Sequence, residues 1–160
     1  MRIGFAKDIH KLEEGKKLFL GGIEVPFEKG LASHSDGDVV LHSLCDAILG
    51  ALNKGDIGIH FPPSDEKYKN KNSIYFLDNV TAIMRDSGFE IEYIDIFISC
   101  EKPKLKDYIL LMREKIAKTI GISVDLVSIK AGTNEGFDSV GQGLAIESYA
   151  SVLLKEKVNG

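Results

Sequence analysis

Residues 34–42 read HSDGDVVLH, and this run joins a polar turn to the first helix of the chain. Gly37 supplies a flexible turn between two aspartates, and Ser35 or Asp36 has a side chain that can cap a helix start. Apolar residues then recur at steps of three and four, which predicts a helix over 36–52. The histidine that closes the run therefore lies in the first turns of that helix.

The motif Asp8-Ile9-His10 supplies further ligand-type side chains near the end of the first predicted strand. A spacing of two residues on a strand points both side chains from one face. With His42 they give one carboxylate and two imidazoles, which is the ligand set of a catalytic zinc with a fourth position open. The alternative interpretation is an aspartate at a strand end with two half-exposed histidines.

Two aspartates on the predicted helix are candidate partners of its histidine. Asp38 and Asp46 lie four residues before and after His42, so all three share a face. A carboxylate there would accept the ring N–H of His42, fix its tautomer and increase its basicity. Asp38 has a competing role in the first turn, where it would face the helix dipole.

The composition is that of an ordinary globular protein. The 160 residues are 44% hydrophobic and 28% charged, and the formal net charge of -4 argues against a general nucleic-acid surface. No apolar run approaches the roughly twenty residues that cross a bilayer, and the N-terminus leads straight into a strand rather than a signal peptide. Cys45 and Cys100 lie far apart, which favours a reducing compartment, so we expect a cytoplasmic protein.

Strand and helix patterns alternate along the chain without a repeat or a linker. The first strand is predicted from Ile3 to near His10, and Pro62-Pro63 excludes a helix from the loop over 55–72. The other predicted elements are a hairpin over 17–26, a helix over 73–87, a strand over 89–99, a helix over 103–120, a strand over 127–131, a glycine-rich loop over 132–143, and a last segment over 144–154 that fits a strand slightly better than a helix. The predicted fold is α/β (α+β two-layer), a mixed sheet with helices packed on one face, in a single domain over 1–160.

Polar loops that follow two predicted strands form another candidate site. Lys102 and Lys104 follow the strand over 89–99, and Thr133 and Glu135 follow the next strand. A hydroxyl suits a phosphate, and a glutamate carboxylate suits Mg²⁺ or Mn²⁺. Because open α/β sheets bind ligands at the carboxyl ends of their strands, we expect the two loops to share one rim.

Several motifs together resemble the 2-C-methyl-D-erythritol 2,4-cyclodiphosphate synthase family. They are Asp8-Ile9-His10, GGIEVP at 21–26, HSDGDVVLH at 34–42, GDIG at 55–58, Phe61-Pro62 and Pro103-Lys104. They occur in order over essentially the whole chain, and the 34–42 run is highly specific. The resemblance implies a lyase of non-mevalonate isoprenoid biosynthesis. Such an enzyme converts 4-diphosphocytidyl-2-C-methyl-D-erythritol 2-phosphate to 2-C-methyl-D-erythritol 2,4-cyclodiphosphate and releases CMP.

The resemblance also implies a homotrimer, with active sites between subunits, and a role for each matching residue. The metal ligands would be Asp8, His10 and His42 for Zn²⁺ and Glu135 for Mg²⁺ or Mn²⁺. The residues that support the transition state would be His34 and Thr133. The substrate-binding residues would be Asp8, His10, His34, Ser35, Asp56, Ile57, Gly58, Phe61, Pro62, Pro63, Ser64, Asp65, Cys100, Glu101, Lys102, Pro103, Lys104, Leu105, Lys106, Ala131, Gly132, Thr133, Asn134 and Glu135.

The chain departs from the family pattern in the run Gly136-Phe137-Asp138-Ser139-Val140 and at five single positions. Lys7 stands beside the zinc motif, Pro63 replaces an acidic residue, Gly132 replaces a hydroxyl residue, and Gln142 and Leu144 stand where an arginine and a glutamate are common. The last two lie at the central cavity of the family's trimer. Because glutamine lacks the charged, bidentate fork of arginine, we expect this cavity to bind isoprenoid diphosphates weakly or not at all.

Two other functions stay open at this point. A zinc phosphohydrolase would use the same open metal position with water as the nucleophile. It would release CMP from substrate analogues that are unable to cyclise. A trimer that is stabilised by metal and has lost turnover would bind zinc without releasing CMP, and the departures near Glu135 and Gln142 motivate it.

Overall fold

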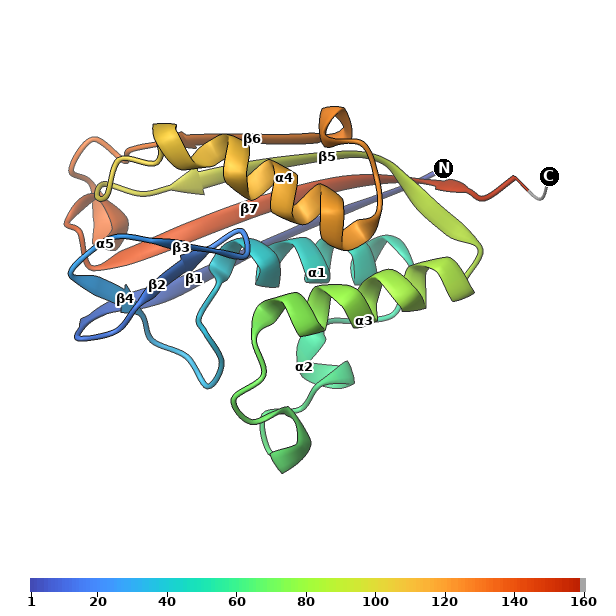
Figure 1. Ribbon diagram of the computed structural model, residues 1–160, viewed down its shortest axis with the longest axis horizontal. Helices are drawn as coiled ribbons and strands as arrows, with labels where there is room; N and C mark the ends of the chain where they lie inside the picture. The colour runs from blue at the N-terminus through green and yellow to red at the C-terminus, as the bar shows by residue number, and fades with distance from the viewer. Residues whose placement is uncertain (159–160) are drawn as a thin grey trace.

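The structure is a computed structural model that describes residues 1–158. Its main sheet has five strands in the order β4-β1-β7-β5-β6 (Figure 1). Neighbouring strands are antiparallel except β5 and β6, which run parallel. The strands are β1 Arg2–Glu14, β4 Lys29–Leu31, β5 Phe89–Ser99, β6 Val127–Gly132 and β7 Ala145–Glu156. The predicted mixed sheet is confirmed, and the last segment of the chain is a strand.

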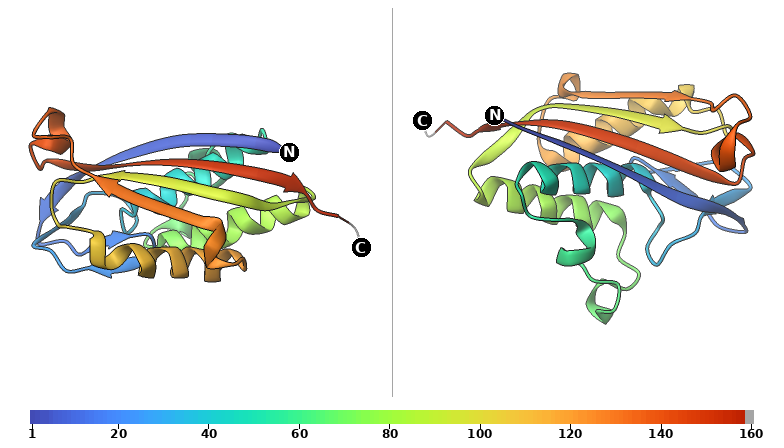
Figure 2. Two further views of the ribbon diagram at one scale, coloured as in Figure 1. Left: turned by 90° about the horizontal axis from the view of Figure 1, so that it is seen from above. Right: turned by 180° about the vertical axis from the view of Figure 1, so that it is seen from behind.

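Three long helices cover one face of this sheet, as the view from above shows (Figure 2). They are α1 Val39–Ala51, α3 Ser73–Asp86 and α4 Ile109–Ile120. α1 packs against β1 and β7, α4 packs against β6, and α3 lies against α1. The result is a mixed α/β domain with helices on one face, as predicted. Within residues 1–158, no helix combines the length and the apolar character that a membrane crossing requires.

The start of α1 is fixed by a buried carboxylate. Asp38 is fully buried, and its Oδ1 accepts a hydrogen bond from the backbone N–H of Leu41 at 3.0 Å. Such a bond satisfies one of the free N–H groups in the first turn of a helix. The predicted cap at Ser35 or Asp36 was therefore wrong, because the helix begins later and Asp38 occupies the capping position.

The same carboxylate ties α1 to the predicted hairpin, which the structure confirms as β2 Leu18–Leu20 and β3 Ile23–Val25. The turn between these strands is Gly21-Gly22, and both glycines have positive φ angles. The backbone N–H of Gly21 donates to Asp38 Oδ1 at 2.9 Å, and that of Gly22 donates to Asp38 Oδ2 at 2.7 Å. Burial raises the pKa of Asp38 to about 6, although the hydrogen bonds from the N–H groups of Gly22 and Leu41 act in the opposite direction.

A glycine in β1 allows α1 to lie directly on the sheet. A Cβ atom at Gly4 would lie 1.9 Å from the carbonyl oxygen of Ala47 in α1. Any larger residue would therefore push the helix away from the strand, because atoms that are not bonded cannot approach so closely. The distance between α1 and β1 matters because both elements supply the candidate metal ligands.

Several predicted boundaries were wrong. β1 continues past His10 to Glu14, and the helix predicted from Pro103 begins at Ile109, after a 3-10 turn. The predicted loops contain short helices that periodicity is too brief to reveal, namely α2 Ile57–His60, η1 Glu66–Tyr68 and α5 Asp138–Gly141. Caps hold two of them, since Asp56 accepts from the N–H of Ile59 and Asp65 from that of Lys67. The short strand β4 was not predicted.

The second face of the main sheet carries no long helix (Figure 2). Side chains alternate along β1, so its odd-numbered residues point away from α1. Three of them are apolar, and Ile3, Phe5 and Ile9 are 77%, 63% and 44% exposed. The ring of Phe5 stacks on that of Tyr149 in the neighbouring strand β7, with 6.4 Å between the centroids. An apolar strip therefore runs along the uncovered face.

Candidate metal centre and active site

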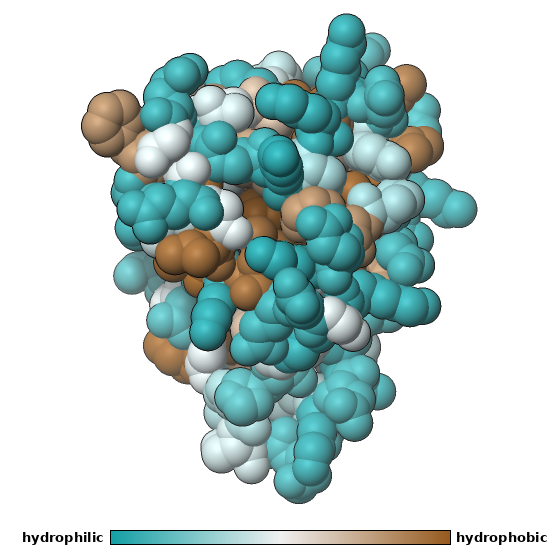
Figure 3. All heavy atoms as spheres, turned by 90° about the vertical axis from the view of Figure 1, so that its left-hand side faces the viewer, coloured by the Kyte–Doolittle hydropathy of each residue, from teal (hydrophilic) through white to brown (hydrophobic). Residues whose placement is uncertain are grey.

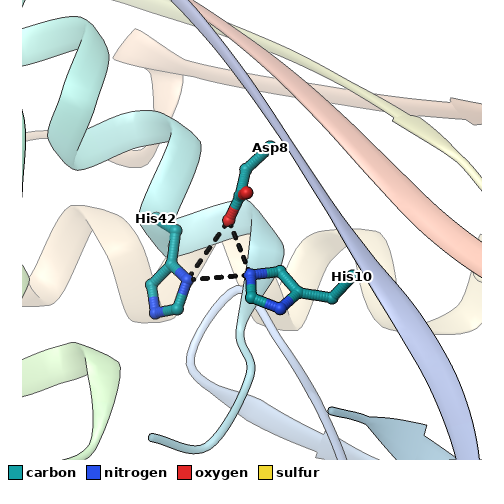
Figure 4. Close-up of side chains that lie close together, drawn as sticks. All are labelled: Asp8, His10 and His42. Carbon is teal, nitrogen blue, oxygen red and sulfur yellow. Dashed lines mark hydrogen bonds and ion pairs between the residues drawn. The ribbon is translucent and has the colours of Figure 1, made fainter. Parts of the chain in front are cut away.

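Three side chains from two elements meet between β1 and the first turns of α1 (Figure 4). Asp8 and His10 point from the same face of β1, as their spacing predicts, and His42 points toward them from α1. Asp8 Oδ2 lies 2.8 Å from His10 Nε2 and 3.2 Å from His42 Nδ1, and the two ring nitrogens are 3.3 Å apart. The sequence motif is thus a compact cluster in space.

The outer hydrogen bonds of the two rings define which nitrogen carries a proton. His10 Nδ1 lies 2.8 Å from the carbonyl oxygen of Ala32, which only accepts, so this nitrogen is the donor. In neutral His10 the lone pair of Nε2 then points into the cluster. On the other ring, His42 Nε2 lies 3.0 Å from Ser73 Oγ and 3.3 Å from Ser35 Oγ.

The cluster fits a divalent cation. A carboxylate oxygen and the inward ring nitrogens of His10 and His42 face one another, and such a set of lone pairs repels itself unless a cation or a proton lies between them. Around a tetrahedral Zn²⁺ at roughly 2.0–2.1 Å, ligand atoms lie about 3.3 Å apart. The separations of 3.2 and 3.3 Å match this value, and that between Asp8 and His10 is shorter at 2.8 Å.

The charges in the cluster shift the pKa values of Asp8 and His10 in opposite directions, and both shifts favour the ionised carboxylate beside positive charge. Burial by itself would raise the pKa of Asp8, but hydrogen bonds with His10 and His42 lower that pKa to about 2. The hydrogen bond with Asp8 raises the pKa of His10 above its usual range, although burial acts in the opposite direction. A carboxylate that stays ionised and attracts positive charge is what a metal ligand requires.

The predicted partners of His42 have other contacts. Asp46 Oδ1 accepts from the backbone N–H of Ile57 at 2.8 Å, and burial raises the pKa of Asp46. Asp38 is the cap of α1. Neither carboxylate is hydrogen-bonded to the His42 ring, so this prediction was wrong; the outer nitrogen is bonded to Ser73 instead. Sequence reasoning missed Ser73 because it begins a separate helix, 31 residues away.

The neighbouring lysine also lies elsewhere. Lys7 precedes Asp8 in the sequence, but alternation along β1 turns its side chain to the uncovered face of the sheet. There Lys7 Nζ forms an ion pair with Glu147 Oε1 at 3.2 Å. The expectation that Lys7 lies beside the zinc site is therefore wrong, because its side chain lies on the opposite face of the sheet.

A cavity of about 500 Å³ adjoins His42, and we call it the metal-side cavity. This volume is in the range of small-molecule sites. Several residues predicted to bind substrate line it, namely His34, Ser35, Ile57, Gly58, Phe61 and Pro63. Lining residues that the sequence did not single out are Ser33, Glu66, Tyr68, Lys69, Asn70 and Phe76. Of the same predicted group, Asp56, Pro62, Ser64 and Asp65 are not among its lining residues.

A second cavity of about 460 Å³ lies where the parallel strands β5 and β6 end, and we call it the strand-end cavity. The predicted common rim is confirmed, because the N–H of Cys100 donates to the carbonyl of Gly132 at 2.9 Å. The predicted residues that line it are Cys100, Pro103, Lys104, Leu105, Lys106, Ala131, Gly132 and Thr133. Glu101 instead joins the two loops, since its Oε1 accepts from the N–H of Asn134 at 2.8 Å.

The two cavities have no lining residue in common within one chain. His34 lines the metal-side cavity and Thr133 the strand-end cavity, so one chain does not bring the two predicted catalytic residues together. Glu135 is exposed, has a positive φ of 54°, and lies outside both linings.

Hydrophilic side chains dominate the end of the molecule that carries the β3, β4 and α5 loops, with hydrophobic ones gathered near its middle (Figure 3).

Fold and site together define a small α/β domain with a candidate metal centre at the wall of a ligand-sized cavity. A family model described as the YgbB family matches residues 1–155, and the chain belongs to this family. A curated relative from Brachyspira hyodysenteriae is named 2-C-methyl-D-erythritol 2,4-cyclodiphosphate synthase. It is 50% identical over 98% of this chain and 99% of its own length. The family resemblance seen in the sequence is confirmed.

The chain is also similar in fold and sequence to solved structures. The bifunctional IspDF from Campylobacter jejuni is 39% identical with a TM-score of 0.93, over 97% of this chain and 42% of that longer one. A 2C-methyl-D-erythritol-2,4-cyclodiphosphate synthase in a CDP-bound form is 30% identical with a TM-score of 0.90, over 96% of this chain and all of the other.

Proposed function

We propose that this protein is a cyclodiphosphate synthase. It converts 4-diphosphocytidyl-2-C-methyl-D-erythritol 2-phosphate to 2-C-methyl-D-erythritol 2,4-cyclodiphosphate and releases CMP, as a lyase of isoprenoid biosynthesis. The observation that carries the proposal is the convergence of Asp8, His10 and His42, of which His42 lines a cavity, in a chain whose curated relatives have this name over nearly their full length.

Charge repulsion dominates the barrier of this reaction. The 2-phosphate oxygen attacks the β-phosphorus of the same molecule, a new P–O bond forms, and the bond to CMP breaks. Both reacting groups are anions, so the enzyme must neutralise charge and hold the groups in line. Asp8, His10 and His42 would hold Zn²⁺, which would supply Lewis-acid neutralisation of the diphosphate charge. No protein nucleophile is required.

The residues of the chain supply position and hydrogen bonds. His34 and Ser35 at the metal-side cavity face the methylerythritol phosphate, and the hydroxyl of Thr133 at the strand-end cavity donates to a phosphate oxygen. The cytidine lies in the strand-end cavity, where backbone groups read the base. Glu135 would hold Mg²⁺ or Mn²⁺ through a hard carboxylate oxygen, and this cation would neutralise phosphate charge.

The active form is a homotrimer in which neighbouring chains complete each site. Two observations support this assembly. The apolar strip with Ile3, Phe5 and Ile9 is exposed in the single chain, and such a strip favours burial against another copy. The two cavities share no lining residue, so His34 of one chain and Thr133 of another can act on one substrate.

The buried, unpaired cysteines support a reducing compartment such as the cytoplasm.

Phosphorus NMR tests the reaction directly. The protein with Zn²⁺ and Mg²⁺ is incubated with the diphosphocytidyl substrate, and we expect the cyclic diphosphate and CMP in equal amounts. His42→Ala is expected to lose zinc and turnover while its circular dichroism stays native. The linear 2,4-bisphosphate, which has two separate monophosphates and no P–O–P bond, in place of the cyclic product would establish the phosphohydrolase instead. Bound zinc with no CMP would establish the trimer without turnover.

A further inference from the structure

The outer face of the metal centre contains a buried serine from a different helix. Ser73 is the first residue of α3, and it is fully buried. The neighbouring Asn72 caps this helix, because its side chain accepts from the N–H of Tyr75. The hydroxyl of Ser73 is therefore free for another role, and its Oγ lies 3.0 Å from His42 Nε2.

An aspartate determines which way the Ser73 hydroxyl points. Asp36 Oδ2 accepts from the backbone N–H of Ser73 at 2.9 Å, and Asp36 Oδ1 accepts from the hydroxyl of Ser73 in a short contact. Asp36 Oδ1 also accepts from the N–H of Asp38 at 3.1 Å. Since an ionised carboxylate only accepts, the hydroxyl proton of Ser73 lies toward Asp36. The lone pairs of Oγ are then directed to the His42 ring.

This direction fixes the tautomer of the metal ligand. Because the Ser73 hydroxyl donates its hydrogen bond to Asp36, Ser73 Oγ accepts from His42 Nε2–H. The lone pair of His42 Nδ1 then points to Asp8 and His10. Ser35 is a weaker candidate for the same role, because its Oγ is 3.3 Å from His42 Nε2 and also contacts Ser33. A ring that is held through its outer nitrogen keeps the orientation that a metal requires.

We propose that Ser73 and Asp36 are positioning residues that hold His42 as the Nε2–H tautomer for metal binding. The inference rests on the proposed zinc centre. The ring of His42 is therefore not held by Asp38 or Asp46, as the sequence predicted. It is held by the hydroxyl of Ser73 at the start of α3, which is oriented by the carboxylate of Asp36 in the turn before α1. The polar run at 34–38 thereby acquires a role in the metal centre that is distinct from capping.

Zinc affinity measures the effect without using turnover. The full-length protein is titrated with Zn²⁺ against a chromophoric chelator, for wild type, Ser73→Ala, Ser73→Thr and Asp36→Asn. We expect Ser73→Ala and Asp36→Asn to weaken binding about 10- to 100-fold, the usual loss when an outer partner of a ligand is removed. Ser73→Thr keeps the hydroxyl and should restore most of the affinity. The asparagine weakens the pair because both oxygens of Asp36 accept, and its NH₂ must face a donor.

Ser43→Ala is the matched control. Ser43 is a buried serine of α1, and its hydroxyl is hydrogen-bonded to the Val40 carbonyl and the Ser148 hydroxyl rather than to a candidate metal ligand. Its zinc affinity should equal that of the wild type. Unfolding curves of the metal-free variants identify any general loss of stability, and nitrogen-15 NMR of the zinc-loaded wild type reads the His42 tautomer directly.

The outcomes separate this inference from the proposed function. If wild type binds zinc and Ser73→Ala binds it as tightly, the positioning role is wrong and the zinc centre stands. An Nδ1–H tautomer of His42 in the zinc-loaded wild type would overturn the inference even if Ser73→Ala failed to fold. A wild type that binds no zinc would overturn both the proposed metal centre and the role of Ser73.

Discussion

At the scale of single residues, the metal centre depends on the partners outside the ligand set. His10 is held by the carbonyl of Ala32 and His42 by the hydroxyl of Ser73, each through the ring nitrogen that faces away from the cluster. With both outer nitrogens protonated, as proposed for His42, the two rings present a lone pair to the same point as the Asp8 carboxylate. The chemistry of the site follows from these two hydrogen bonds as much as from the identity of the ligands.

Substitutions of Asp46 distinguish a role in the metal centre from a role in the wall of the metal-side cavity. Asp46→Ala removes the acceptor of the Ile57 N–H at the wall of the metal-side cavity, whereas Asp46→Asn keeps an oxygen there. A hydrogen bond of this kind is worth roughly 0.5–1.5 kcal/mol, so Asp46→Ala should raise KM about 2- to 10-fold with zinc affinity unchanged. Steady-state kinetics and a zinc titration measure the two effects. A tenfold weaker zinc affinity in Asp46→Asn would return Asp46 to the metal centre.

Cys100 is expected to be unreactive at neutral pH. Burial raises the pKa of this thiol to about 12, and its Sγ donates to the carbonyl of Lys102 at 3.3 Å. Because only the thiolate is nucleophilic, alkylation by iodoacetamide at pH 8 should be roughly a thousandfold slower than in the unfolded chain. The rate should rise about tenfold per pH unit between pH 7 and 9. Peptide mass spectrometry follows the labelling, and rapid labelling of native Cys100 at pH 7 would contradict the raised pKa.

At the scale of secondary-structure elements, one carboxylate joins a hairpin to a helix. Asp38 accepts from the N–H groups of Gly21, Gly22 and Leu41, and all of these contacts are made by a fully buried side chain. These hydrogen bonds tie α1 to β2 and β3, in addition to the apolar contacts of the shared core. Since α1 carries His42, the carboxylate also helps to place this candidate metal ligand, although it is not hydrogen-bonded to the His42 ring.

Asp38→Ala should therefore be strongly destabilising. It leaves three N–H groups without their acceptor, and each unsatisfied buried donor costs about 1–3 kcal/mol. We expect a loss of about 3 kcal/mol or more in the free energy of unfolding. Asp38→Asn keeps one oxygen and should lose less. Urea denaturation at one fixed protein concentration measures both variants, with Asp36→Asn as a comparison from the same loop. A loss below about 1 kcal/mol in Asp38→Ala would show that water replaces the carboxylate.

At the scale of the whole molecule, the uncovered face of the sheet predicts assembly. Wild type should sediment at about 53 kDa, the mass of three chains of 17.6 kDa. Phe5→Glu places a charge in the apolar strip, where burial against another chain would be costly, and should shift the mass toward one chain. Leu111→Glu is the control, because Leu111 is 49% exposed on α4, away from the strip. A wild type that sediments as a single chain would contradict the trimer.

Much of the candidate site could be predicted because the signals are local. The two-residue spacing of Asp8 and His10 on a strand defines their common face, and the apolar period after Gly37 defines the helix that carries His42. The loops after β5 and β6 were predicted to share a rim, since parallel neighbours end at the same edge of a sheet. Short helices such as α2 were missed because four residues carry no measurable period.

The sequence by itself determined the ligand types, the elements that carry them and the family. Only the tertiary structure decided which atoms meet. Ala32 and Ser73 lie 22 and 31 residues from the rings that they hold, and Lys7 lies on the opposite face from its neighbour Asp8. The hydrogen-bond partners of a buried side chain are set by the packing of elements that are distant in the sequence. A local sequence pattern therefore specifies the chemistry of a side chain, and the fold specifies the groups with which that side chain interacts.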